Sequence, residues 1–198
     1  MQTNRLEAFS DGVLAIIITI MVLKLEVPSG ADWQSLVPLY PIFLSYILSF
    51  LYVGIYWNNH HHLLQATRQV NGAVLCANLH LLFWLSLLPF STGWMGANHF
   101  DALPTAMYGF NLAACALAYW VLVHSITRAA KNNCELRFAI GRDYKGMISV
   151  ACYCLAVPLA FYHQWISQLI YLIMALLWII PDSRIEKNIE KSMAKSSD

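Results

Sequence analysis

The sequence predicts an all-α protein that crosses a membrane several times. Of its 198 residues, 59% are hydrophobic and only 12% are charged, and the mean hydropathy is +0.53. These values lie outside the usual composition of soluble domains. The apolar residues gather in six segments, each near the length that a tilted helix needs to cross a bilayer. These segments are residues 9–27, 36–57, 73–95, 103–126, 147–162 and 165–181.

The basic residues predict the orientation of these six transmembrane helices. Eleven of the twelve lysines and arginines lie before the first segment, between the second and third, between the fourth and fifth, or after the sixth. An even number of spans places all four regions on one side, and basic residues accumulate on the cytoplasmic side. Both termini are therefore expected in the cytoplasm. Residues 1–181 form the predicted membrane domain, and residues 182–198 form a short cytoplasmic tail.

Composition and motifs exclude several classes of function. A formal net charge of +1 argues against a nucleic-acid partner, which would require a basic surface. The spans contain no phosphate-binding loop, no nucleophile in a recognisable elbow and no paired carboxylates. The five cysteines have no paired metal spacing, and no cofactor is expected. An enzyme is therefore not expected, and the remaining classes are channels, transporters and subunits without a pathway of their own.

The first apolar segment has two unusual features. Its uncharged run, residues 12–23, is only twelve residues long, so Asp11, Lys24 or both lie close to hydrocarbon. An ionisable residue in that position is a hypothesis of function. Read at helical spacing, the large apolar side chains form one stripe of Phe9, Val13, Ile16, Ile20 and Leu23. The stripe either packs in a bundle or against lipid, or it lines a pore between copies of this helix.

A polar cluster closes the second apolar segment, where Trp57 and Asn58 precede three histidines, His60, His61 and His62. Neighbouring residues on a helix point about 100° apart, and no Cys, Asp or Glu lies near to complete a ligand set, so no metal site is expected. Hydrogen bonding to Arg5, Ser10 or Asp11 of the first helix is the expected role.

Two further interpretations concern these polar residues. Asn78 stands among apolar residues of the third segment, as is typical of a residue that hydrogen-bonds between membrane helices. A proton-coupled or metal ion transporter that uses Asp11 and the histidines 60–62 as a relay remains the alternative to a channel.

The start of the chain resembles the signature of a known family. Arg5 is followed after three residues by Phe9-Ser10-Asp11 and an apolar helix, which is similar to the transmembrane protein 175 family of potassium channels of prokaryotes and animal lysosomes. The cluster of residues 57–62, and Asn78 with Pro89-Phe90, also look like that family's pattern. The animal members join two six-span repeats. A single six-span unit is similar to the prokaryotic branch, whose members assemble as tetramers.

This resemblance implies a modestly potassium-selective channel in the cell membrane of a prokaryote, a homotetramer in contact with lipid. The first helix of each subunit would line the central pore, with apolar rings at Ile16, Ile20 and Leu23 as constriction and filter and with Thr19 as a nearby polar position. A structural network would position that helix, formed by Arg5, Phe9, Ser10, Asp11, Trp57, Asn58, His61 and Asn78. Which of the three histidines takes part is left open.

Overall fold

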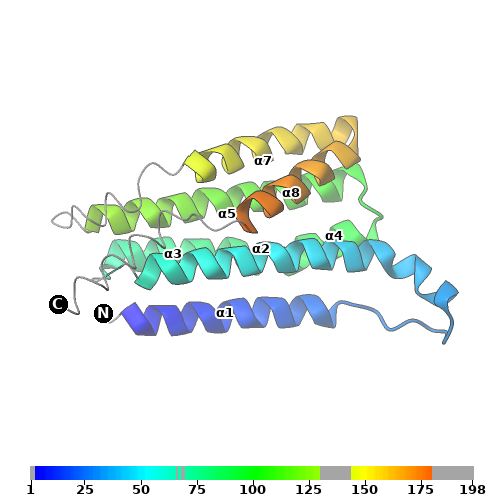
Figure 1. Ribbon diagram of the computed structural model, residues 1–198, viewed down its shortest axis with the longest axis horizontal. Coiled ribbons are helices and arrows are strands. Elements are labelled where there is room, and N and C mark those ends of the chain that lie inside the picture. Colours follow the sequence, from blue (N-terminus) through cyan, green and yellow to red (C-terminus); the bar gives the residue numbers. More distant parts are fainter. Residues whose placement is uncertain (1–2, 66, 68–69, 130–143, 180–198) are drawn as a thin grey trace.

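The computed structural model describes residues 3–65, 67, 70–129 and 144–179. Within these ranges the regular structure is helical and forms one elongated bundle (Figure 1). Two short 3₁₀ turns, η1 (Trp33–Ser35) and η2 (Val37–Leu39), precede the second long helix. The α-helices are α1 (Thr3–Leu23), α2 (Tyr40–Gln65), α3 (Gly72–Ser86), α4 (Leu88–Ala97), α5 (Ala102–Ala129), α7 (Tyr144–Tyr162) and α8 (Gln164–Ile179).

The predicted all-α membrane architecture is confirmed, and the described residues form five apolar spans and one shorter helix. Five helical stretches are long and apolar enough to cross a membrane, and α3 and α4 together form one of them. The sixth, α8, has 16 residues, fewer than the roughly 20 that a full crossing needs. The predicted tail, residues 182–198, lies outside the described residues.

The break between α3 and α4 falls at a proline. α3 ends at Ser86, and α4 begins at Leu88 with Pro89 in its first turn. Proline has no backbone N–H and its ring crowds the preceding turn, so a helix is interrupted before it. α2 differs from its prediction because it continues to Gln65. The three histidines therefore lie on the last turns of α2.

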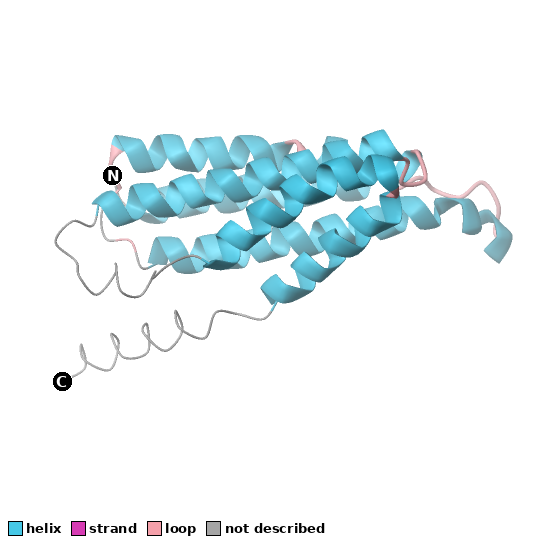
Figure 2. Ribbon diagram, turned by 90° about the horizontal axis from the view of Figure 1, so that it is seen from above, coloured by secondary structure: helices cyan, strands magenta, loops and turns pink. Residues whose placement is uncertain are grey.

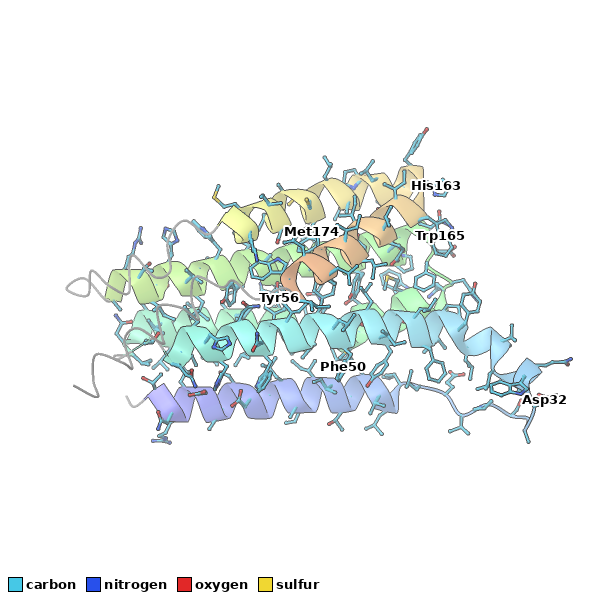
Figure 3. All side chains as sticks on the ribbon, viewed as in Figure 1. Asp32, Phe50, Tyr56, His163, Trp165 and Met174 are labelled. Atoms are coloured by element: carbon cyan, nitrogen blue, oxygen red, sulfur yellow. The ribbon has the colours of Figure 1, made fainter. Side chains whose placement is uncertain are left out.

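The helices run alternately up and down, so that their ends gather at two sides of the bundle. α1 packs against α2, α3 and α4, while α7 and α8 form a hairpin on the opposite side (Figures 1 and 2). Only His163 separates α7 from α8, as Figure 3 shows at the tip of the hairpin. The start of α1, the ends of α2 and α5 and the start of α7 consequently share one end of the bundle.

The loop between α1 and α2 projects from the other end of the bundle, where Asp32 lies (Figure 3). The carboxylate of Asp32 accepts hydrogen bonds from the backbone N–H of Ser35 at 3.0 Å and from its hydroxyl at 2.5 Å. These bonds stabilise the ionised form and lower the pKa of Asp32. The loop therefore begins its first 3₁₀ turn with a charged N-cap.

Tyrosines form much of the buried core between α2, α5, α7 and α8. The Tyr153 hydroxyl donates to the Tyr52 hydroxyl at 3.1 Å, which in turn donates to the backbone carbonyl of Tyr171 at 2.7 Å. The Tyr171 hydroxyl donates to the carbonyl of Thr105 at 3.1 Å. A buried hydroxyl needs such partners because leaving one unpaired costs free energy. The core is therefore held by directional bonds as well as by packing.

Replacing Gly109 with Ala should destabilise this core. The added Cβ would meet the Tyr171 hydroxyl and lie 2.8 Å from its ring carbon Cζ, so the ring must shift and its bond to Thr105 must weaken. We expect a loss of about 1–3 kcal/mol, measured as thermal unfolding of the purified protein in detergent. The control is Gly54→Ala, whose Cβ meets nothing within 4 Å and should not destabilise. Equal melting temperatures for the two variants would contradict the prediction.

Candidate functional site

Three buried polar side chains meet where α1, α2 and α3 come together. Asn78 of α3 donates from Nδ2 to the Ser10 hydroxyl at 3.0 Å, and its Oδ1 lies 2.7 Å from Nε2 of His60. Ser10 in turn donates to the carbonyl of Leu6 at 2.8 Å. Because the amide oxygen of Asn78 only accepts, Nε2 of His60 is the donor. One amide therefore connects α3 to both α1 and α2.

A second set of polar contacts lies beside the first, nearer the surface of the single chain. The indole N–H of Trp57 donates to Oδ1 of Asp11 at 3.1 Å. Gln65 donates from Nε2 to Nε2 of His61 at 2.9 Å, and Nδ1 of His61 lies 2.7 Å from Oε1 of Glu7. His61 thus accepts at one ring nitrogen and donates at the other, as a neutral imidazole does. These contacts join the end of α2 to the first turns of α1.

The predicted network residues divide between those that meet and those that do not. The two sets bring together Ser10, Asp11, Trp57, His61 and Asn78. Arg5, Phe9 and Asn58 lie at the same end of the bundle but enter neither set.

The structure adds two residues to the predicted network. His60, which the sequence left undecided, contributes the buried ring, and Glu7 pairs with His61. Glu7 lies one helical turn before Asp11 and therefore on the same face of α1, which is the sequence signal that could have indicated its role.

The apolar stripe of α1 faces away from its own chain. Ile16, Ile20 and Leu23 are 59%, 42% and 76% exposed. The Thr19 side chain is also exposed, and its hydroxyl donates to the carbonyl of Ala15 at 2.8 Å. The opposite face of the helix is buried against the bundle. Its residues are Leu6, Ser10, Leu14, Ile17 and Met21. α1 therefore has one face attached to its own subunit and one open apolar face.

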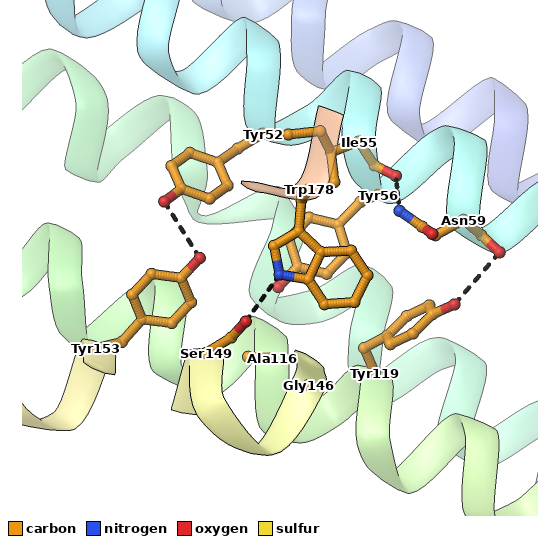
Figure 4. A pocket seen from close by; sticks show the side chains of 10 residues that line it. All are labelled: Tyr52, Ile55, Tyr56, Asn59, Ala116, Tyr119, Gly146, Ser149, Tyr153 and Trp178. Carbon is orange, nitrogen blue, oxygen red and sulfur yellow. Dashed lines mark hydrogen bonds between the residues drawn. The ribbon is translucent and has the colours of Figure 1, made fainter. Parts of the chain in front are cut away.

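A cavity of about 30 Å³ lies on the far side of α2, between α2, α5, α7 and α8 (Figure 4). Its walls include the rings of Tyr56, Tyr119 and Trp178. The Tyr119 hydroxyl donates to the Asn59 carbonyl at 3.3 Å, and the Trp178 indole donates to the Ser149 hydroxyl at 2.7 Å. The cavity is thus separate from the open face of α1. Among the described residues, no group of three or more His, Cys, Asp or Glu side chains could hold a metal ion.

A helical bundle with several membrane-spanning helices, one of them presenting an open apolar face, defines the class of multi-pass membrane proteins. Within that class, residues 5–89 match the family profile "Endosomal/lysosomal potassium channel TMEM175". A potassium channel of Chryseobacterium sp. is 53% identical over 192 residues, which cover 97% of this chain and 100% of that protein. The chain belongs to the TMEM175 family, which comprises ion channels and not enzymes.

A solved structure and a mammalian relative extend the comparison. The crystal structure of a lysosomal potassium-selective channel TMEM175 homolog from Chamaesiphon minutus superposes with a TM-score of 0.77 at 26% identity, covering 90% of this chain and 96% of that chain. The mouse endosomal/lysosomal proton channel TMEM175 is 37% identical over 98 residues, covering 43% of this chain and 20% of that protein. The fold of the family therefore extends over most of this chain, as the sequence predicted.

Removing the amide of Asn78 should loosen α1 from the bundle. In Asn78→Leu, the N–H of His60 loses its acceptor and the Ser10 hydroxyl loses its donor, each in a buried position. One buried group left unpaired costs about 1–3 kcal/mol, so the melting temperature in detergent should fall. The control is Asn98→Leu, which loses only a local bond to the carbonyl of Trp94.

A double-mutant cycle separates this effect from a change in packing. If the Asn78–Ser10 bond carries the effect, Ser10→Ala and Asn78→Ala should be non-additive by about 1 kcal/mol. Additive losses would contradict a direct coupling between the two side chains.

Proposed function

We propose that this chain is the subunit of a potassium channel whose pore is formed by α1 of four copies. The observation that carries the proposal is the open apolar face of α1 on a helix whose other face is buried. The names of the bacterial relatives, which are potassium channels, support the permeant ion. A homotetramer would bring four such faces around one axis.

Ile16, Ile20 and Leu23 form the proposed constriction and filter. Their side chains have the exposure that a pore-lining stripe requires in the isolated subunit. A ring of apolar side chains makes an ion give up part of its water with little in return. Potassium holds its water less tightly than sodium, so the barrier is lower for potassium. Thr19, at the edge of the same face, offers oxygen atoms in partial replacement, and selectivity is accordingly modest.

The polar network is proposed to fix the position of the pore helix. Asp11 and Ser10 belong to the first turns of α1, and their bonds to Trp57 and Asn78 connect those turns to α2 and α3. A charge near hydrocarbon persists when it is paired and hydrogen-bonded. The network thereby allows α1 to keep a carboxylate at this depth and a defined rotation about its axis.

The proposed location is the cell membrane of a prokaryote, with both chain termini in the cytoplasm. Arg5, Arg128 and Lys145 belong to helix ends that share one side of the bundle, whereas Lys24 follows the other end of α1. Basic residues favour the cytoplasmic side. The remaining basic residues of this argument lie outside the described part of the chain.

Proton conduction is a second candidate, because the mammalian relatives are named proton channels. The similarity to the mouse protein extends over 98 residues, which are 43% of this chain. Proton conduction would require a continuous chain of water molecules or polar groups through the rings of Ile16 and Ile20. Potassium conduction requires these rings to be wide enough to admit water together with the ion.

Reversal potentials test both candidates. Purified protein in a planar bilayer, with potassium on one side and sodium on the other at equal pH, should give a current that reverses towards the potassium equilibrium potential. A pH gradient at symmetric potassium should shift the reversal potential only slightly. A reversal that follows the pH gradient would support proton conduction instead, and no current from protein of verified fold would contradict a channel.

Replacing Ile16 with Asn should raise the single-channel conductance and lower the preference for potassium over sodium. Four amides in place of four apolar side chains would hydrate the constriction and lower the barrier for both ions. The matched control is Ala15→Asn, which adds the same group at the same depth but about 100° around the helix, on an exposed position. Unchanged permeability ratios in Ile16→Asn, or the same change in both variants, would count against Ile16 as the constriction.

A further inference from the structure

His80 is a polar side chain on the outer surface of α3, inside the stretch that crosses the membrane. It lies about 12 Å along the helix from Gly72, between Leu79 and Leu81. The hydrocarbon of a bilayer offers no hydrogen-bonding partner, and an ionisable side chain exposed there is costly. An exposed histidine at this depth therefore needs a partner.

The hydrogen bond between Trp84 and the His80 ring determines what that partner must supply. The indole N–H of Trp84 lies 3.0 Å from Nε2 of His80. An indole only donates, so Nε2 carries no proton and the neutral ring carries its proton at Nδ1. In the described part of the chain, Nδ1 has no acceptor. His80 thus presents a donor to whatever lies outside this subunit.

Asp11 supplies a complementary acceptor at the same height in the membrane. The bond between Ser10 and Asn78 places those two residues at one level. Asp11 follows Ser10, and His80 is two residues beyond Asn78, so the levels of Asp11 and His80 agree within about one helical turn. Oδ1 of the half-buried Asp11 accepts from Trp57, and a carboxylate has further acceptor positions. Oδ2 of Asp11 has no donor among the described residues.

The donor and the acceptor lie on opposite flanks of the subunit. α1 packs against both α2 and α3, and Asp11 faces α2 because it binds Trp57. On α3, Asn78 faces α1 and α2, and two residues turn a helix by about 200°. His80 therefore faces away from them. A head-to-tail ring of identical subunits brings one flank of each subunit against the opposite flank of the next. It would therefore bring the donor of one copy and the acceptor of its neighbour together at the same height.

We propose that, in the oligomer, Nδ1 of His80 of one copy donates a hydrogen bond to the carboxylate of Asp11 of the next copy. The partner is a second copy of this chain, because lipid at this depth has no acceptor and the copy has one. The inference rests on the proposed oligomeric channel and adds the pair that sets the rotational register between neighbouring subunits.

Cross-linking tests the pair directly. In a variant without the five native cysteines, Asp11→Cys and His80→Cys are combined and treated with a short thiol-reactive cross-linker in native membranes. We expect covalent dimers, trimers and tetramers on a denaturing gel, and monomers from either single variant. The control pair is Asp11→Cys with Leu103→Cys, an exposed position at the opposite end of the bundle. Monomers from the test pair, in protein that runs as an oligomer on gel filtration in mild detergent, would overturn the contact.

Oligomer stability provides a second measurement that leaves Asp11 intact. His80→Leu should raise the subunit dissociation constant in detergent, followed by native mass spectrometry, by at least about tenfold, because it removes a hydrogen bond to a charged group. His80→Gln keeps a donor and should recover most of the stability. The control is His124→Leu, an exposed histidine of α5 whose ring contacts Trp120.

The outcomes separate this inference from the proposed function. If His80→Leu dissociates no more readily than wild type while the wild-type oligomer conducts potassium, only the pair is overturned. If the wild-type protein is a monomer in its membrane, the oligomeric pore fails and the pair fails with it. The contact would be supported if His80→Leu raised the subunit dissociation constant, His80→Gln restored it and His124→Leu left it unchanged.

Discussion

The amide of Asn78 is the interaction on which the arrangement of α1, α2 and α3 depends. Its nitrogen donates to Ser10 and its oxygen accepts from His60, so one side chain uses both of its functional groups between three helices. Membrane helices have little hydrophobic drive to associate because lipid is as apolar as their side chains. A satisfied polar bridge therefore specifies which faces meet. Once these three helices are in register, their orientation determines which face of α1 stays open and which side chains lie on the flanks of the subunit.

The sequence predicts much of this fold because apolar length, prolines and charge bias are local signals. The apolar segments and the break at Pro89 follow from composition and from the missing backbone N–H of proline. The second apolar segment was predicted to end at residue 57, whereas α2 continues to Gln65. Asparagine and histidine lower the mean hydropathy of residues 58–62, but they do not end the helix. A helical end of α2 is stabilised by tertiary bonds, such as that of His60, which hydropathy does not register.

The candidate site was predictable in its residue types but not in its pairings. Ser10, Asp11, Trp57 and Asn78 were identified from the family resemblance and from their polarity in apolar surroundings. Which histidine points inward depends on the rotation of α2, and that rotation depends on how α2 packs against α1, α4 and α8. A single sequence carries no signal for this angle. The stripe of α1 was visible at helical spacing, whereas its exposure required knowing which face the other helices cover.

The position of the polar bridge near one end of α1 has a mechanical consequence. Ser10 lies about 9 Å from Ile16 and about 20 Å from Leu23 along the helix, and the bonds that attach α1 to α2 and α3 all involve its first half. Beyond Asp11, the packing of Leu14, Ile17 and Met21 holds the helix, and among the described residues no side-chain hydrogen bond joins this part of α1 to another helix. A tilt of α1 about the bridge would therefore displace Leu23 about twice as far as Ile16. In the proposed pore, the ring at Leu23 is accordingly suited to open and close, and the ring at Ile16 to keep a constant radius.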